Sequence, residues 1–312
     1  MTYAHRSFTF LLSLTPIVVL CYRKGGYGIV MNAGSSHTEM KTLYWDAASP
    51  LDAPIEVGKS IKMKPGISSF KDDLSKVSDM LPLLEQARSN LDEVGVDWAE
   101  VPLFLGATGG MRLLPTSNRV AIMASIRPYF RENGFRVDND DWVRVLSGME
   151  EGTFGWLTLN MSLKTLNGST ESTVGVIDIG GASVQLTYLP KVSPLNNKHH
   201  LDIVDYEFSL YSRSIASLGN DQARKLYEHK LASSGESADP CLPIGENNTI
   251  SLAGSSDPAK CKEVVKSILP LDVPCHIFDG LECSMLNEHL LTLEQVRELF
   301  IDTLLCRYPI VL

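Results

Sequence analysis

Three features are scarce in this 312-residue chain, and each scarcity excludes a class of protein. Basic residues are outnumbered, with 28 Lys and Arg against 37 Asp and Glu and a net charge of −9, so no basic stripe is available for a nucleic-acid backbone. No cysteines have the paired C-x-x-C spacing of a zinc site. No apolar run reaches the roughly 20 residues that a membrane-spanning helix needs. We therefore expect no nucleic-acid polymer as a partner.

The longest apolar run lies near the N-terminus, over residues 8–21, with basic residues on both sides. It contains Pro16 and has about 14 residues, which is short for a bilayer span. We interpret residues 1–24 as a signal peptide or signal anchor, and a buried N-terminal helix is the alternative. The rest of the chain is then secreted or membrane-anchored, outside the cell or in the secretory lumen.

Cysteines and sequons favour the same compartment. After the N-terminal segment, all five cysteines lie in the last quarter of the chain: Cys241, Cys261, Cys275, Cys283 and Cys306. Asn-x-Ser/Thr sequons occur at Asn160, Asn167 and Asn247, although such triplets also arise by chance. Together they indicate an oxidising environment in which disulfides persist and glycans are added.

Two glycine-rich segments are the most informative part of the sequence: residues 27–37 (YGIVMNAGSSH) and 176–183 (VIDIGGAS). Each is an apolar run typical of a buried strand, followed by a tight turn and a second strand-like segment. Glycine lets the backbone approach an anion closely, and successive amides with Ser hydroxyls donate to phosphate oxygens. The pair predicts two facing phosphate-binding hairpins, of which the first carries Asn32 where the second carries Asp178.

Strands and helices alternate along the chain, which predicts an α/β architecture. The strand–loop–strand pattern restarts at residue 174 and indicates an internal duplication. We place a lobe boundary near Gly152, with lobe I over residues 25–152 and lobe II over 153–312. The other expected elements are strands over 101–105 and 142–146, helices over 74–91, 118–131, 223–231 and 261–269, a polar linker through 64–66, and loops over 233–248 and at His199 and His200.

Four motifs stand in order along the chain: MNAGSSHT (31–38), GATGGMRLL (106–114), SGMEEGTFGW (147–156) and DIGGASVQLTY (178–188). In this order they resemble the apyrase family of nucleoside triphosphate diphosphohydrolases, the ectonucleotidases, in the actin, Hsp70 and sugar-kinase superfamily. The resemblance covers residues 27–280 and is strongest to the cell-surface branch. It implies two RNase H-like lobes with a cleft between them, and hydrolysis of the terminal phosphates of nucleoside tri- and diphosphates.

Phosphoanhydride hydrolysis needs a cradle for the charged chain, a divalent cation and a positioned water. Glu150 and Glu151 are expected at a strand end. By resemblance the second, Glu151, is the general base; its alternative is a solvated helix-start carboxylate, a role that fits Glu150 better. Ser183 and Gln185, at alternate positions on one strand face, orient the water; their alternative is a pair of half-exposed strand residues. The residues matching the cradle are Gly34, Ser35, Ser36 and His37 on one side, Gly180, Gly181 and Ala182 on the other, and Thr108 beside the terminal phosphate.

The resemblance also implies a cation, Ca²⁺ or Mg²⁺, whose water shell Asp178 would hold together with a weakened partner, Asn32. The alternative for Asp178 is a turn-forming role. Arg112 either faces the site or pairs structurally with an acidic neighbour, and we favour the structural role. Trp156 is expected in the core.

Several departures from the family pattern bear on activity. Asn32 replaces the family's Asp and removes a full charge near the cation, so metal affinity and rate should both fall. Gly109 replaces Ala, which should loosen its loop, and Met149 replaces Gln. Cysteines that flank the first helix in surface members are replaced by Ile61 or Lys62 and by Leu83. Cys241 and Cys261 match a pair that is retained.

The family's aromatic-rich fifth motif and its C-terminal helices have no counterpart, so the second lobe is expected to be incomplete, by about a hundred residues. The leading hypothesis is a cation-dependent nucleotide hydrolase that uses direct water attack without a phosphoenzyme. A kinase or ATPase of another superfamily branch, acting on an acceptor, is the second. A catalytically impaired, nucleotide-binding remnant or splice form is the third. The oligomeric state is open.

Overall fold

The computed structural model describes residues 25–166, 172–190, 197–203, 206–216 and 218–268. The predicted signal segment, the sequon at Asn167 and Cys21, Cys275, Cys283 and Cys306 lie outside the described residues. Within the described part of the chain, no helix is both long enough and apolar enough to cross a membrane. The chain forms two compact units, Met1–Ala216 and Ser217–Leu312. The division into lobes at Gly152 stays a prediction.

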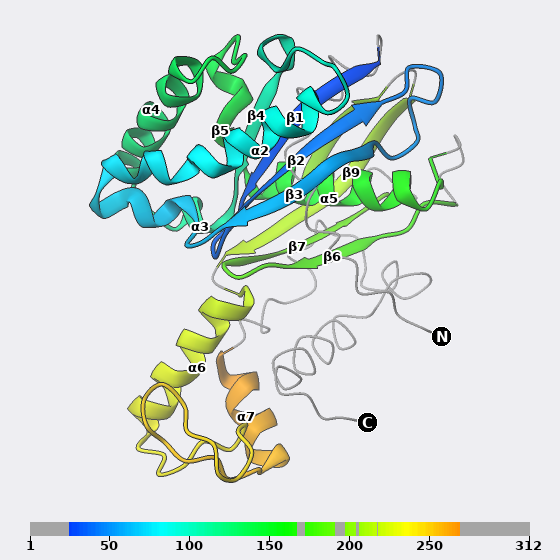
Figure 1. Ribbon diagram of the computed structural model, residues 1–312. Helices are drawn as coiled ribbons and strands as arrows, with labels where there is room; N and C mark the ends of the chain where they lie inside the picture. The colour runs from blue at the N-terminus through cyan, green and yellow to red at the C-terminus, as the bar shows by residue number, and fades with distance from the viewer. Residues whose placement is uncertain (1–24, 167–171, 191–196, 204–205, 217, 269–312) are drawn as a thin grey trace. The chain divides into compact units, whose positions relative to one another are not determined.

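The first unit contains a five-stranded sheet in the order β3-β2-β1-β4-β5 (Figure 1). The β1–β2 hairpin predicted from the first glycine-rich segment is present, and β4 and β5 extend the sheet parallel to β1. The linker expected before residue 66 is largely the edge strand β3, whose side chains are mostly exposed. Its alternation of Ile55, Val57, Ile61 and Met63 with polar residues is interrupted by Lys59. The strands are β1 Gly26–Ala33, β2 Thr38–Trp45, β3 Ile55–Met63, β4 Leu103–Ala107 and β5 Val143–Val145.

Helix α2 (Leu81–Asp92) covers β2 and β3, and Asn90 fastens it there. The Asn90 side chain accepts from Lys59 N at 3.0 Å and donates to Lys59 O at 2.9 Å and to Thr42 Oγ1 at 3.2 Å. Hydrogen bonds therefore join β3 to α2, the elements that hold Ile61, Lys62 and Leu83 in place of the family's cysteines. The remaining helical segments of this half are η1 Ile67–Asp72, η2 Leu74–Met80, η3 Trp98–Glu100, α3 Gly109–Arg112, α4 Thr116–Glu132 and η4 Asp140–Trp142.

A second, antiparallel sheet in the same unit has the order β6-β7-β9-β8. The β6–β7 hairpin repeats the β1–β2 hairpin, as the predicted duplication requires. Among the described residues no strand pairs with the outer edge of β6, whereas β4 occupies the corresponding edge of β1. His199 and His200 lie in strand β8 and not in the loop that the sequence predicts. Leu201 and Ile203 of the same strand are buried. The strands are β6 Val176–Ile179, β7 Ser183–Tyr188, β8 Lys198–Ile203 and β9 Tyr206–Ala216.

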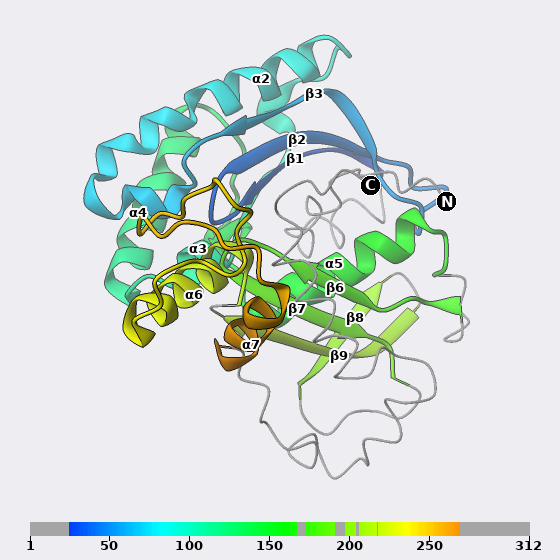
Figure 2. The ribbon, with the colours of Figure 1, turned by 90° about the horizontal axis from the view of Figure 1, so that it is seen from below.

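Helix α5 (Gly148–Ser162) lies between the two sheets (Figures 1 and 2). Its side chains are apolar on several faces, as expected for a helix enclosed by protein, and Trp156 is 0% exposed, which confirms its core position. Ser147 and Glu150 form a capping box at its start. Glu150 and Glu151 therefore lie in the first turn of a helix and not at a strand end, because the Ser-x-x-Glu spacing nucleates a helix two residues after β5.

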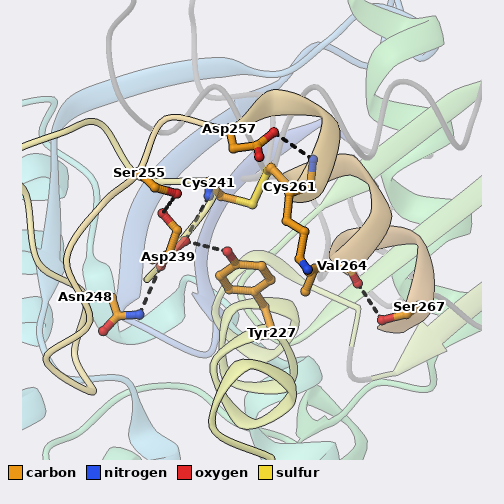
Figure 3. Close-up of a disulfide and its surroundings, with 10 residues drawn as sticks. Tyr227, Asp239, Cys241, Asn248, Ser255, Asp257, Cys261, Val264 and Ser267 are labelled. Atoms are coloured by element: carbon orange, nitrogen blue, oxygen red, sulfur yellow. Dashed lines mark hydrogen bonds between the residues drawn. A yellow bond between two sulfur atoms is a disulfide. The ribbon is translucent and has the colours of Figure 1, made fainter. Parts of the chain in front are cut away.

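The second unit joins α6 (Asn220–Ser234) to α7 (Pro258–Ile268). The Cys241–Cys261 disulfide that the resemblance implied is present. Beside it, the fully buried Asp239 carboxylate accepts hydrogen bonds from the Tyr227 hydroxyl, from Cys241 N at 2.9 Å and from Asn248 Nδ2 at 3.0 Å (Figure 3). These bonds organise the long loop between the helices around one carboxylate.

Candidate active site

The two glycine-rich loops are brought together by Gly109 and Gly110, at the start of α3. A Cβ atom on Gly110 would lie 2.6 Å from Ser35 Cα in the first loop. A Cβ atom on Gly109 would lie 2.7 Å from Ser183 Oγ and 2.9 Å from Ala182 Cβ, beside the second loop. All three distances are shorter than real Cβ atoms show. Gly109, expected to loosen its loop, is instead the point at which α3 contacts the second hairpin.

Arg112 and Glu151 form the centre of the site. Glu151 is 6% exposed, in the first turn of α5. Arg112 Nη2 donates to Glu151 Oε2 at 2.5 Å and to Ser183 Oγ at 2.9 Å, while Nη1 donates to Leu146 O at 3.2 Å. Arg112 therefore pairs with an acidic neighbour, as expected, but that neighbour is the candidate base. Arg112 therefore both faces the candidate site and forms an ion pair, so the two alternatives for this residue hold together.

Ser183 and Gln185 lie on one face of β7 and are both buried, so they are not half-exposed strand residues. Gln185 Nε2 lies 2.8 Å from Ser183 Oγ and 3.2 Å from Glu151 Oε2. Gln185 Oε1 is buried and has no hydrogen-bond partner among the described residues. The carboxylate beside Nε2 fixes the orientation of the amide, because the opposite orientation would place two acceptors against each other.

A third polar residue, Ser214 on β9, contacts this cluster and was not anticipated from the sequence. It lies opposite Gln185 in the β7–β9 register, and Gln185 Nε2 donates to its Oγ at 2.9 Å. Gly148, the first residue of α5, packs so closely on Ser214 that a Cβ at position 148 would overlap it. The sequence does contain a signal for a polar cluster here. Phe208 and Leu210 begin an alternating apolar face of β9, and Ser212 and Ser214 replace apolar residues at the next positions of that face.

Burial dominates the electrostatics of the site. It raises the pKa of Glu151; the Arg112 guanidinium opposes this effect by charge and by hydrogen bonding, the Asp178 charge adds to it, and a Thr108 hydrogen bond lowers it. Burial also raises the pKa of Asp178 to about 6. A carboxylate whose pKa is raised toward neutrality suits a general base.

The remaining predicted residues occupy the expected loops. Thr108, 4% exposed, immediately precedes α3, and its Oγ1 donates to Ala33 O at 3.4 Å. Gly34, Ser35, Ser36 and His37 connect β1 to β2, and Gly180, Gly181 and Ala182 connect β6 to β7. Burial lowers the pKa of His37, and the charge of Lys62 lowers it further.

Asp178 and Asn32 occupy corresponding positions at the ends of the first strands of the two hairpins. Asp178 lies on β6 opposite Gln185, and Asn32 lies on β1 opposite Glu39. Both therefore lie next to the loops that the sequence predicts to bind phosphate. The described residues contain no group of three or more His, Cys, Asp or Glu side chains that could hold a metal directly.

Residues 18–300 match the GDA1/CD39 (nucleoside phosphatase) family. The chain belongs to this family. Relatives within or near it include ectonucleoside triphosphate diphosphohydrolase 5 of Ailuropoda melanoleuca, 33% identical over 69% of this chain and 50% of the relative. The Golgi apyrase of Schizosaccharomyces pombe is 31% identical over 82% of this chain and 51% of the relative. This GDA1/CD39 chain thus spans about half the length of these curated relatives.

The fold of this GDA1/CD39 chain also matches a solved structure. The nucleoside triphosphate hydrolase of Neospora caninum aligns with a TM-score of 0.50 and 16% identity, covering 74% of this chain and 53% of that one. At this identity the similarity concerns the fold alone. It confirms the α/β architecture, and the family match confirms the resemblance that the four motifs predicted.

Proposed function

We propose that this GDA1/CD39 chain hydrolyses the terminal phosphates of nucleoside tri- and diphosphates by direct attack of water. The observation that carries the proposal is the buried cluster of Glu151, Gln185, Ser183 and Arg112, in which a carboxylate of raised pKa contacts a buried amide and an arginine. The names of the relatives, ectonucleoside triphosphate diphosphohydrolases and apyrases, support the same substrate class.

Glu151 acts as the general base. The attacking water donates one proton to Glu151 and the other to Gln185 Oε1, an acceptor that no described residue satisfies. Ser183 Oγ, held by Arg112 and Gln185, fixes the water oxygen. The water oxygen bonds to the terminal phosphorus while the bridging oxygen leaves with the shortened nucleotide. No phosphoenzyme is formed, because no side chain acts as the nucleophile.

The phosphate chain lies against the two loops and Thr108. Backbone amides of Gly34–His37, and of Gly181 and Ala182, donate to phosphate oxygens, as successive amides in tight turns do. The Gly180 N–H donates to Ser183 O at 3.1 Å, so Gly180 contributes by shaping the second loop. The contact of Gly109 and Gly110 with both loops sets their separation.

The residues fit a divalent cation bound through water. Asp178 offers a carboxylate whose pKa burial raises to about 6, and a nearby cation would favour its ionised form. Asn32 and Thr108 add neutral oxygens, the ligand type that Ca²⁺ and Mg²⁺ prefer, and a small set of protein ligands suits a cation that keeps several waters. When bound, Ca²⁺ or Mg²⁺ would neutralise charge on the phosphate chain.

Location in the secretory pathway or outside the cell is also part of the proposal, with the N-terminal segment as a signal peptide or anchor. The Cys241–Cys261 disulfide supports an oxidising compartment. Of the sequons in the described residues, only Asn247 suits a glycan: it is exposed, whereas Asn160 is 0% exposed and bonded to Trp156 O, Val174 and Thr165.

The test is phosphate release by the purified, secreted chain from ATP, ADP and UDP with Ca²⁺ or Mg²⁺. We expect release that depends on the cation and that falls at least about a thousandfold in Glu151→Gln, the loss typical of a general base combined with disruption of its water site. Absence of release from all three nucleotides contradicts the proposal. Nucleotide binding without turnover would favour the impaired remnant, and nucleotide loss that requires an acceptor would favour a kinase.

A further inference from the structure

The two duplicated hairpins carry the same pair of chemical groups in opposite order. In the second hairpin Asp178 is followed seven positions later by Gln185; in the first, Asn32 is followed seven positions later by Glu39. Each pair faces across its hairpin, Asp178 opposite Gln185 and Asn32 opposite Glu39. Each hairpin therefore presents one carboxylate and one carboxamide, and in the first hairpin the carboxylate has moved to the second strand.

Directly opposite residues of an antiparallel pair have Cβ atoms about 4.5–5.5 Å apart on the same face of the sheet. The Glu39 side chain thus emerges beside that of Asn32, and a Glu side chain is one methylene longer than Asp. The carboxylate of Glu39 can reach the space that an Asp at position 32 would occupy.

This face of the sheet is the one that looks toward α5. The opposite face of β2 carries Thr42, which contacts Asn90 of the covering helix α2. In the row that contains Glu39 and Asn32, Gly106 and Arg144 follow on β4 and β5. Arg144 at the end of that row pairs with Glu150 of α5 at 2.6 Å. Glu39 therefore lies on the face of the sheet that is turned toward α5, the helix that carries Glu150 and Glu151.

Burial and charge distinguish Glu39 from an ordinary surface carboxylate. The Glu39 side chain is 9% exposed. Its Oε2 lies 3.6 Å from Nζ of Lys62, whose side chain is 43% exposed. Glu56 on the same sheet is the contrast: it is 39% exposed and pairs with Lys41 at 2.8 Å. Glu39 is thus the less exposed of the two carboxylates, and its ion pair is the longer one. Glu39 also acts electrostatically on His37 of the first phosphate loop.

We propose that Glu39 supplies, beside the first phosphate loop, the carboxylate for a divalent cation that Asn32 cannot supply. The inference rests on the proposed function for the presence of a cation, and goes beyond it in assigning a ligand, direct or through water, at a position outside the four motif roles. The exchange of Asp for Asn at position 32 is then a relocation of charge and not a loss.

The test measures binding of Mn²⁺ to the full chain by electron paramagnetic resonance, without nucleotide and without turnover. We expect Glu39→Gln to weaken Mn²⁺ binding about tenfold, the effect of removing one nearby charge at partial solvent screening. Glu56→Gln, which removes an equal charge from the neighbouring strand, should change it less than about twofold. Lys62→Met should tighten binding, because it removes a competing cation.

The decisive variant is the exchange Asn32→Asp with Glu39→Gln, which restores the carboxylate to position 32 at constant net charge. It should bind Mn²⁺ within about threefold of the wild type. Circular dichroism checks folding of each variant, and this exchange keeps the test valid if Glu39→Gln alone misfolds. Equal affinity of folded Glu39→Gln and wild type, or failure of the folded exchange variant to bind, overturns the inference.

Phosphate release measured in parallel separates this inference from the proposed function. A chain that releases no phosphate but loses Mn²⁺ affinity on Glu39→Gln contradicts the proposed function and supports the Glu39 assignment. If the wild-type chain hydrolyses nucleotides but Glu39→Gln leaves the Mn²⁺ affinity unchanged, the proposed function is supported and the Glu39 assignment is contradicted. A wild-type chain that binds no Mn²⁺ overturns the Glu39 assignment.

Discussion

Arg112 Nη2 lies 2.5 Å from Glu151 Oε2, so the one arginine of the glycine-rich α3 segment holds the candidate base. Burial raises the pKa of Glu151, and the positive charge of Arg112 opposes that rise. The arginine therefore offsets part of the effect of burial and favours the ionised form of Glu151, while the pKa stays above its ordinary value, as suits a base.

Replacing Arg112 by Met should shift the acid limb of the pH–rate profile upward. Without the guanidinium, burial acts on Glu151 unopposed, its pKa rises, and more of the base is protonated at a given pH. We expect kcat to fall about tenfold or more near pH 7 and to recover partly at higher pH. Arg144→Met is the matched control, because Arg144 pairs with the adjacent Glu150. An unshifted acid limb in Arg112→Met would contradict this role.

Ser214→Ala should lower kcat about fivefold to tenfold with little change in KM, the loss expected for one hydrogen bond. Ser214 is a positioning residue: it touches Gln185 and acts through that amide. Ser212→Ala is the control, since Ser212 bonds Thr187 and Met149 O on the same strand face but does not reach Gln185. In a Gln185→Ala background, Ser214→Ala should have no further effect on kcat. Additive losses would show that Ser214 acts independently of Gln185.

Gly109→Ala should reduce stability and kcat, although it introduces the residue typical of the family. The new Cβ would lie 2.7 Å from Ser183 Oγ, so Ser183 must rotate away from the water site, at a cost of about 1–3 kcal/mol for overpacking. The Ala182 Cβ, 2.9 Å from the new atom, must shift as well. Gly110→Ala should cost more, because its Cβ would lie only 2.6 Å from the backbone of Ser35. Thermal unfolding and steady-state kinetics measure both; an unchanged Gly109→Ala protein would refute the close contact.

In the absence of divalent cations, the free energy of unfolding should fall as the pH rises, because the Asp178 carboxyl titrates. Burial raises its pKa from the ordinary 3.8 to about 6 in the folded chain. A carboxyl with a raised folded-state pKa contributes stability that is fully present below pH about 4 and is lost as the pH passes about 6. Relative to Asp178→Asn, the wild type should lose about 2–3 kcal/mol of unfolding free energy between these limits.

Denaturant unfolding at a series of pH values measures that difference. Saturating Ca²⁺ should reduce it, because the cation stabilises the ionised carboxylate that burial disfavours. Parallel pH profiles for the wild type and Asp178→Asn would mean that the carboxyl is not titrating in the folded chain.

Local sequence patterns predicted much of the fold for a physical reason. The apolar runs of β1 and β4 report burial directly, and the glycine-rich turns identify both hairpins. Strands β3, β8 and β9 were not predicted. In β3 and β8 the side chains are largely exposed or polar, so the apolar alternation is weak; in β9 it is interrupted by Ser212 and Ser214. The helical position of Glu151 was available in the Ser147–Glu150 capping box but was assigned to a strand end.

The sequence by itself determined the family, the duplicated hairpins and the chemical types of the candidate site residues, because motifs and turn residues are local. Only the tertiary structure decided which groups meet. Arg112, Glu151, Ser183 and Ser214 come from α3, α5, β7 and β9, and no spacing along the chain encodes their contacts. Likewise the position of Glu39 opposite Asn32, on which its proposed role rests, follows only from strand register, because pairing across a hairpin sets which side chains share a face.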